Sequence, residues 1–215
     1  MCYVLLLWRL DLVLSNEETC PFIFSRGAHG DFRVFCIIIV PISVERKVTE
    51  MGGEEIRIVP ADSEELLGQV RDIFREYQAS LGIDLDFQGF EEELASLPGK
   101  YAPPRGRLFL AFVSEKLAGC VALRPLGGDN CEMKRLYVRP EFRGRKLGRL
   151  LAEKVITEAR KEEYAEMYLD TLPAMLAAQA MYRSLGFRLT GPYCYNPVEG
   201  TQYMMLDLLQ DNQAG

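Results

Sequence analysis

Alternating and helically spaced apolar residues predict a strand followed by a helix at the start of the regular pattern. Residues 54–59 (EEIRIV) alternate between apolar and polar side chains, as a half-buried strand does. Apolar residues then recur at helical spacing over 66–77. Asp62 and Glu65 form a capping-box pattern before this run, and Gly82 is expected to end the helix.

The remaining pattern predicts a three-strand meander followed by alternating helices and strands. Pro173 suits the first turn of the last helix, and Gly186 suits its end. The predicted elements are a short helix over 90–97, strands over 107–113, 117–126 and 130–138, a helix over 147–163, a strand over 165–171, a helix over 173–185, and strands over 187–190 and 202–209. This order predicts an α/β fold: a mixed, mostly antiparallel central sheet of about six to seven strands, flanked by helices on both faces.

Residues 1–50 differ from this pattern. Their two apolar runs, YVLLLW and VFCIIIVPI, are shorter than the ~20 residues that span a bilayer. No basic leader or small-residue cleavage site indicates a signal peptide. Met51 precedes two glycines, as a chain start does. We therefore expect a domain over 51–215 and an N-terminal extension over 1–50 outside the fold, either upstream translation or a loosely packed arm. A genuine N-terminal subdomain is the alternative.

Composition narrows the chemistry. The chain is 48% hydrophobic with a formal net charge of −6, which argues against a nucleic-acid binder that works through whole-domain charge. Its six cysteines form no CxxC pair, so we expect reduced thiols in a cytoplasmic protein and no metal site. The only histidine, His29, lies in the extension. Proton transfer is therefore expected to use Glu, Asp, Tyr, Lys, Cys or water.

Cations concentrate in one stretch of this acidic chain. Its only acidic residue is Glu141, and its basic residues are Lys134, Arg135, Arg139, Arg143, Arg145, Lys146 and Arg149. Within it, a predicted strand runs through the turn EFRGRKLG into a long helix. A helix N-terminus has unpaired N–H groups and a partial positive charge, so this turn is suited to phosphate. Nucleic-acid binding and an exposed helix end without a ligand are the alternatives.

Three segments together resemble the GNAT superfamily of N-acetyltransferases. They are CEMKRLYVRPEFRGRKLGRLLAEKVI, MYLDT and AMYRSLGF, and the resemblance covers about residues 55–208. The family signature is [RQ]-x-x-G-x-[GA] at a strand-to-helix turn, with a later helix ending LYxxxGF. The resemblance implies the GNAT fold, acetyl-CoA as cosubstrate without a metal, and an amine acceptor. It also implies a monomer or homodimer that binds neither nucleic acid nor membrane.

The resemblance assigns the coenzyme A site to two adjacent segments. The pantetheine arm is expected to pair with the main chain of Leu136, Tyr137 and Val138. The pyrophosphate is expected on the backbone N–H groups of Arg143, Gly144, Arg145, Lys146, Leu147 and Gly148.

Two positions depart from the family pattern. Lys146 stands where the signature usually has glycine, and a side chain is tolerated there if φ stays negative. Met175 stands where an asparagine often begins the last helix. One contact to the pantetheine is therefore expected to differ.

The resemblance also implies two catalytic side chains. Glu132 matches a general base, acting directly or through a water chain, and alternation places it on the same strand face as Leu136. Tyr182 matches the tyrosine that protonates the departing thiolate. A backbone N–H near Val138 is expected to hold the oxyanion.

The acceptor side is expected within 77–106 and 193–203. Tyr101, Tyr193 and Tyr195 are candidates for an aromatic wall. Acidic side chains there attract a cationic acceptor or form a solvated face, and they are Asp84, Asp86, Glu91, Glu92 and Glu93. The leading hypothesis is thus an N-acetyltransferase acting on a primary amine of a small molecule, peptide or protein. A non-catalytic acyl-CoA-binding module is the alternative.

Overall fold

The computed structural model describes residues 23–26, 32–35, 48–51, 54–83, 85 and 89–210. The chain divides into two compact units, Met1–Val44 and Glu45–Gly215. In the first unit, β1 (Ile23–Arg26) and β2 (Phe32–Phe35) pair antiparallel. His29 lies outside the described residues.

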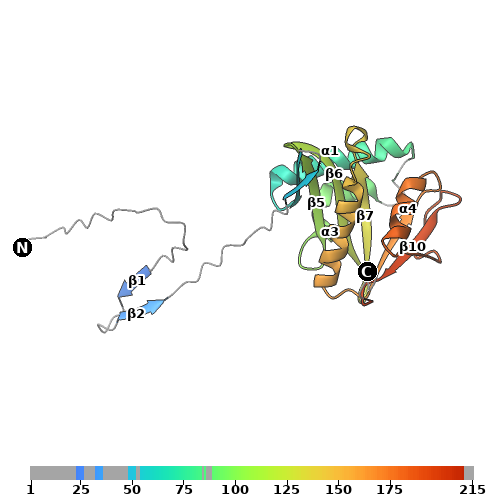
Figure 1. Cartoon of the computed structure of the whole chain (residues 1–215). Coiled ribbons are helices and arrows are strands. Elements are labelled where there is room, and N and C mark those ends of the chain that lie inside the picture. Colours follow the sequence, from blue (N-terminus) through green and yellow to red (C-terminus); the bar gives the residue numbers. More distant parts are fainter. Residues whose placement is uncertain are drawn as a thin grey trace, which may run out of the picture. The chain divides into compact units, whose positions relative to one another are not determined.

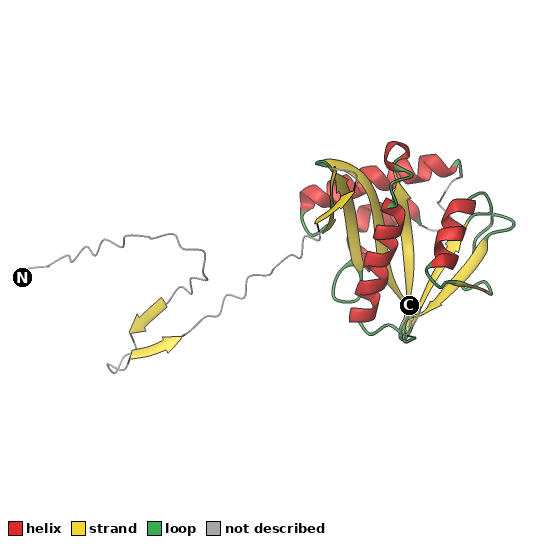
Figure 2. Ribbon diagram, in the orientation of Figure 1, coloured by secondary structure: helices red, strands yellow, loops and turns green. Residues whose placement is uncertain are grey.

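The second unit contains one sheet of eight described strands in the order β3-β4-β5-β6-β7-β8-β10-β9 (Figures 1 and 2). The strands are β3 (Val48–Met51), β4 (Glu54–Pro60), β5 (Arg107–Val113), β6 (Lys116–Gly127), β7 (Asn130–Val138), β8 (Glu166–Thr171), β9 (Arg188–Thr190) and β10 (Gln202–Asp207). Neighbours are antiparallel except β7 and β8. The mixed, mostly antiparallel sheet predicted from the sequence is confirmed.

The strand β3 reaches into the predicted extension. It pairs with β4 in the register Val48↔Arg57 to Met51↔Glu54. The sheet therefore begins three residues before Met51. That the native chain starts near Met51 stays a prediction.

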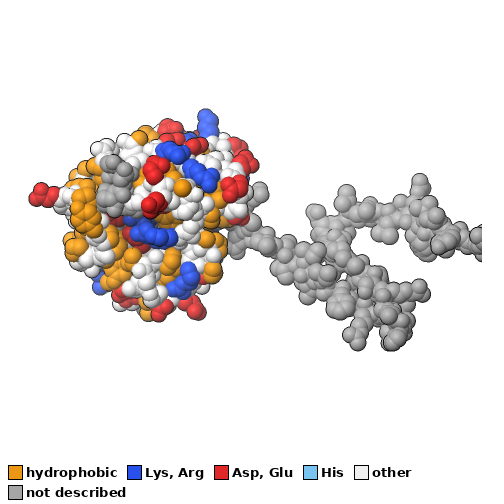
Figure 3. Space-filling model, turned by 180° about the vertical axis from the view of Figure 1, so that it is seen from behind, with side chains coloured by type: hydrophobic (Ala, Val, Ile, Leu, Met, Phe, Trp, Pro, Cys, Tyr) orange, Lys and Arg blue, Asp and Glu red, His pale blue; other side chains and the backbone are white. Residues whose placement is uncertain are grey.

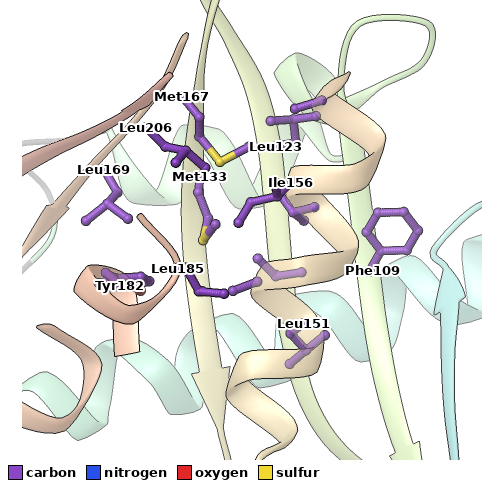
Figure 4. Packing of buried hydrophobic residues seen from close by; sticks show 14 of the residues in the cluster. Phe109, Leu123, Met133, Leu151, Ile156, Met167, Leu169, Tyr182, Leu185 and Leu206 are labelled. Atoms are coloured by element: carbon purple, nitrogen blue, oxygen red, sulfur yellow. The ribbon is translucent and has the colours of Figure 1, made fainter. Parts of the chain in front are cut away.

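Helices cover both faces of this sheet, because alternate residues of its strands enter two separate cores. On β5, Phe109 and Ala111 join the core under α3 (Leu147–Lys161) and α4 (Leu176–Ser184). Leu108 and Leu110 join the core under α1 (Glu64–Leu81) and α2 (Phe90–Ser96). Figure 4 shows side chains of the first core between α3, α4 and the strands. The predicted two-faced arrangement is confirmed.

Two helix starts differ from the predicted ones. Ser63, not Asp62, caps α1: its side-chain oxygen accepts a hydrogen bond of 3.3 Å from the Leu66 N–H. Gly82 ends α1 at φ 65°, as predicted. The helix α4 begins at Leu176, so Pro173 lies in the turn before it rather than in its first turn. Short polar side chains compete for a cap by local geometry, which a spacing pattern does not distinguish.

The parallel strands β7 and β8 separate soon after they meet. Their pairing runs only from Asn130↔Glu166 to Glu132↔Tyr168. Beyond Glu132, the edge of β7 that faces β8 has no strand partner among the described residues. This opening in the sheet positions the candidate site.

Candidate active site

A pocket of about 90 Å³ occupies the opening between β7 and β8. Lys134 and Asp170 line it from the side of α1 and α2, because their strand neighbours Met133 and Leu169 belong to the opposite core. Tyr182 of α4 lines it from that opposite side. The pocket thus joins the two faces of the sheet. We call it the notch.

Glu132 lies beside the notch, fully buried and held by three donors. Its Oε2 accepts a 2.5 Å contact from Arg124 Nε, and its Oε1 lies 3.3 Å from Lys134 Nζ. The Tyr193 hydroxyl donates to the same Oε1 at 2.9 Å. Burial disfavours the charged form of Arg124, but Glu132, Tyr101 and Glu93 together outweigh burial and raise the guanidinium pKa. Both oxygens of Glu132 are therefore occupied, and Glu132 does not line the notch.

Asp170 has a more open environment than Glu132. Its Oδ2 accepts a 2.8 Å hydrogen bond from Asn196 Nδ2. Its Oδ1 lies 3.8 Å from Lys134 Nζ, which is longer than a hydrogen bond. This carboxylate faces the notch, and one of its oxygens is only loosely engaged.

Tyr182 reaches the notch from the face of the sheet that α3 and α4 cover. Figure 4 shows it on α4 beside Leu169 of β8. Its ring packs edge-on against Phe187 with centroids 5.6 Å apart. Burial, and then the nearby Tyr77 and Asp170, raise the pKa of Tyr182. The phenol is therefore protonated at neutral pH.

A bulge at Arg135 places Glu132 and Leu136 on opposite faces of the sheet. Arg135 has φ 56°, and the β6–β7 register shifts beside it. As a result, Leu136 packs with the core under α3 and α4, whereas Tyr137 packs with the other core. Glu132 lies on the opposite face from Leu136, so the prediction that they share a face is wrong.

The side chain of the bulged residue is held by another element. The Arg135 guanidinium donates two hydrogen bonds to Glu93 of α2, at 2.8 and 3.1 Å, and stacks over Phe90. Arg135 is buried, as is Lys134. These two cations therefore belong to the interior and not to a surface patch.

The predicted phosphate turn connects η3 (Pro140–Phe142) to α3. Gly144 has φ 77°, and the first helical bond runs from the Leu150 N–H to the Lys146 carbonyl at 3.1 Å. No side chain caps this helix. The first turn of α3 therefore presents N–H groups after the C-terminal end of β7, the strand that also lines the notch.

Lys146 adopts a backbone conformation that differs from the expected one. It is the N-cap of α3 with φ 55°, in the left-handed region that favours glycine. The condition that φ stays negative is therefore not met. This conformation gives a physical reason for the glycine usual at this signature position.

Most of the cations around this turn already have partners. Arg139 donates to Glu76, Arg145 contacts Glu54, and Arg149 contacts Glu153. Arg143 Nε donates to the Val138 carbonyl at 3.1 Å. Figure 3 shows Lys and Arg side chains interspersed with Asp and Glu on the face that it presents. Among the described residues, the structure records no ion pair for Lys146, so backbone N–H groups and few free charges are available to a phosphate.

The predicted aromatic wall is not assembled. Tyr193 joins the Glu132 network, but Tyr101 is buried beneath α1, edge-on to Phe74. Tyr195 is exposed. Asp84 and Asp86 lie outside the described residues.

Sequence reasoning missed Asp170 and Arg124 as members of the site. Both are charged residues at the ends of otherwise apolar strands, in MYLDT and VALRPL. A charge in such a position needs a partner or a function, and this was the available signal.

Glu132, Asp170 and Cys194 bring one potential ligand atom each within 4.8 Å of one another. The Lys134 ammonium already contacts both carboxylates, so the protein itself supplies a cation here. We assign no metal to this group. The three described cysteines, Cys120, Cys131 and Cys194, are free thiols.

Comparison with known proteins agrees with this architecture. The model of the acetyltransferase (GNAT) family matches residues 69–187. An uncharacterized N-acetyltransferase of Schizosaccharomyces pombe is 46% identical over 138 residues, covering 63% of this chain and 85% of that protein.

Solved structures share the fold. A GNAT acetyltransferase of Staphylococcus aureus superposes with a TM-score of 0.60 at 22% identity, covering 71% of this chain and 99% of that one. The PaiA N-acetyltransferase of Thermoplasma acidophilum, solved with coenzyme A, gives 0.55 at 18% identity, covering 71% and 98%. Among the described residues, no helix combines the length and apolar character needed to cross a membrane. The chain belongs to the GNAT family of acetyltransferases.

Proposed function

We propose that this enzyme transfers the acetyl group of acetyl-CoA to a primary amine by direct attack. One observation carries the proposal: a notch lined by Asp170 and Tyr182 opens beside β7, and the turn that follows β7 leads into a helix whose first N–H groups have no side-chain cap. A phosphate-bearing thioester is the kind of substrate that fits both places. A non-catalytic acyl-CoA-binding module would have no use for the paired acid and base groups of the notch.

Coenzyme A is placed along two segments in this proposal. Its pyrophosphate binds the N–H groups from Arg143 to Gly148, including those of Gly144, Arg145, Lys146 and Leu147. Its pantetheine adds as a strand to the unpaired edge of β7 at Leu136, Tyr137 and Val138. The absence of a described strand partner on this edge supports the second placement.

In this transfer the acceptor nitrogen loses two protons, and a C–N bond replaces the C–S bond of the thioester. The protonated amine gives one proton to a carboxylate of the protein, and its nitrogen then attacks the thioester carbon. The C–N bond forms, the C–S bond breaks, and the sulfur takes a proton from the Tyr182 hydroxyl. The new amide nitrogen returns a proton to Tyr182, and the carboxylate releases its own to water.

Glu132 enters this proposal in a modified role. Direct abstraction would require Tyr193, Lys134 or Arg124 to leave its hydrogen-bonding position. We therefore propose that Glu132 anchors the charges of the acceptor side and does not abstract the proton directly. Tyr182 keeps the role of general acid.

The function is tested by incubating the purified chain with acetyl-CoA and a panel of L-amino acids, aliphatic polyamines and short peptides. We expect thiol release that depends on one class of amine, with an equal amount of N-acetylated product by mass spectrometry. Tight binding of coenzyme A without turnover on any amine would instead favour the non-catalytic module. The absence of both would overturn the proposal.

A further inference from the structure

Two carboxylates, Glu132 and Asp170, lie within reach of the same lysine but differ in access. Both contact Lys134 Nζ, at 3.3 and 3.8 Å respectively. Glu132 is fully buried and carries three donors, whereas Asp170 lines the notch. A general base must come within hydrogen-bond reach of the proton that it abstracts. A substrate in the notch can therefore reach Asp170 but not Glu132.

The loosely engaged oxygen of Asp170 is suited to receive a proton. Asn196 holds Oδ2 at 2.8 Å and so fixes the plane of the carboxylate. Within the described part of the chain, Oδ1 has only the 3.8 Å contact to Lys134, so an incoming ammonium can approach it without displacing a hydrogen bond. The orientation of Asp170 is thus fixed while one acceptor position stays open.

Asp170 and the predicted acid Tyr182 also share the notch. Asp170 lines it from the side of α1 and α2, and Tyr182 lines it from the side of α4. Burial raises the pKa of Tyr182, and the charges of Tyr77 and Asp170 add to the rise. A thioester carbon between them would have a base on one side and an acid on the other.

Other groups complete the surroundings of Asp170. Lys134 comes from β7, Tyr77 from α1 and Tyr182 from α4. Tyr203 of β10 pairs with Asp170 across the sheet, and Cys194 also interacts with its charge. Of these neighbours, only Lys134 is a cation; Arg135 also lines the notch, but it is paired with Glu93.

We propose that Asp170 is the catalytic carboxylate that accepts the proton of the acceptor amine, and that Glu132 is a positioning residue that acts through Lys134. This inference rests on the proposed acetyl transfer. The amine gives its proton to Asp170 Oδ1 and attacks the thioester, and the steps that follow are those given above. Glu132 holds Lys134, together with Arg124 and Tyr193, in place on the acceptor side and takes no proton itself.

Two small amines separate the roles. Ethylamine is protonated at neutral pH and needs a base, whereas hydroxylamine is largely the free base. Asp170→Asn should lower turnover of ethylamine about 100-fold near neutral pH. The loss should shrink as the pH rises, and the loss for hydroxylamine should be under about tenfold. Glu132→Gln should lower turnover of both amines by the same factor at every pH.

Thermal melting and coenzyme A titration show whether each variant is folded. Asp170→Glu, which keeps a carboxylate, should recover part of the ethylamine turnover even if Asp170→Asn folds poorly. Equal losses with both amines in Asp170→Asn, or a selective ethylamine loss in Glu132→Gln, would overturn the assignment. If the wild type binds coenzyme A but acetylates neither amine nor any acceptor of the panel, the proposed function itself fails.

Discussion

The phosphate turn and the notch both gather charged residues beside β7, but they handle charge in opposite ways. At the turn, Arg145 and Arg149 form exposed ion pairs. The backbone N–H groups at the start of α3 have no side-chain cap and are available to a ligand. Beside the notch, Arg124, Glu132 and Lys134 are largely buried, and both cations contact Glu132. Exposed pairs contribute little to stability, whereas a buried pair is costly to break. The turn should therefore tolerate side-chain changes that the notch does not.

The largest expected effect is on stability at the notch. Arg124→Met leaves the buried Glu132 without its closest cation, and we expect a loss of about 3 kcal/mol in the free energy of unfolding. Urea denaturation measures it. Arg145→Ala at the turn is the matched control and should cost under about 1 kcal/mol. Equal losses in the two variants would remove the contrast between the regions.

The next effect is on turnover. Tyr182→Phe removes the hydroxyl that lines the notch, and we expect turnover to fall about 10- to 100-fold. Coenzyme A affinity, measured by calorimetry, should stay within about twofold because the turn is untouched. Unchanged turnover would show that Tyr182 only packs against Phe187.

The third expected effect is a loss of stability at alkaline pH. Burial raises the pKa of the Cys131 thiol from 9.0 to about 12. Above pH 9 the unfolded chain loses this proton while the folded chain keeps it, so stability falls between pH 9 and 12 by up to about 1.4 kcal/mol per pH unit. Denaturation at a series of pH values should show a shallower fall in Cys131→Ala. The same slope in both proteins would show that the Cys131 thiol does not cause the fall in stability.

The smallest effect is at the turn itself. Lys146 has φ 55°, and glycine adopts this conformation without strain. Lys146→Gly should therefore raise the free energy of unfolding by about 1 kcal/mol. A lower stability would indicate that the lysine side chain has a compensating contact. Coenzyme A titration of the same variant shows whether the lysine charge contributes to binding.

The same contrast separates what the sequence predicts from what it does not. The bounds of β5 and β7 agree with the predicted ranges, because each strand is a short run between turn residues that are adjacent to it in sequence. The phosphate turn is likewise contiguous in sequence. The partner of the bulged Arg135 is Glu93, which is 42 residues away, so no local pattern reveals their contact.

The acceptor side was harder to predict for a related reason. Asp170 joins the site only because β7 and β8 separate after Glu132 and Tyr168, and pairing length is a property of the whole sheet. Tyr101 was a candidate for the aromatic wall because of its side-chain type, but it is buried under α1. Long-range packing decided both outcomes.

Binding of coenzyme A at the first turn of α3 is the central claim, and Gly148 allows a direct test. A Cβ there meets only ordinary contacts, 3.7 Å to Val138 and 3.9 Å to Met181, so substitution is tolerated sterically. An aspartate in a first helical turn stabilises the helix by about 0.5 kcal/mol but repels phosphate. Gly148→Ala is the matched control.

The measurement is calorimetric titration of coenzyme A into the wild type, Gly148→Ala and Gly148→Asp, with melting temperatures taken alongside. We expect the wild type and Gly148→Ala to bind with similar affinity. Gly148→Asp should bind at least about tenfold more weakly while melting no lower than the wild type. Unchanged affinity in Gly148→Asp would contradict the placement of the pyrophosphate at this turn.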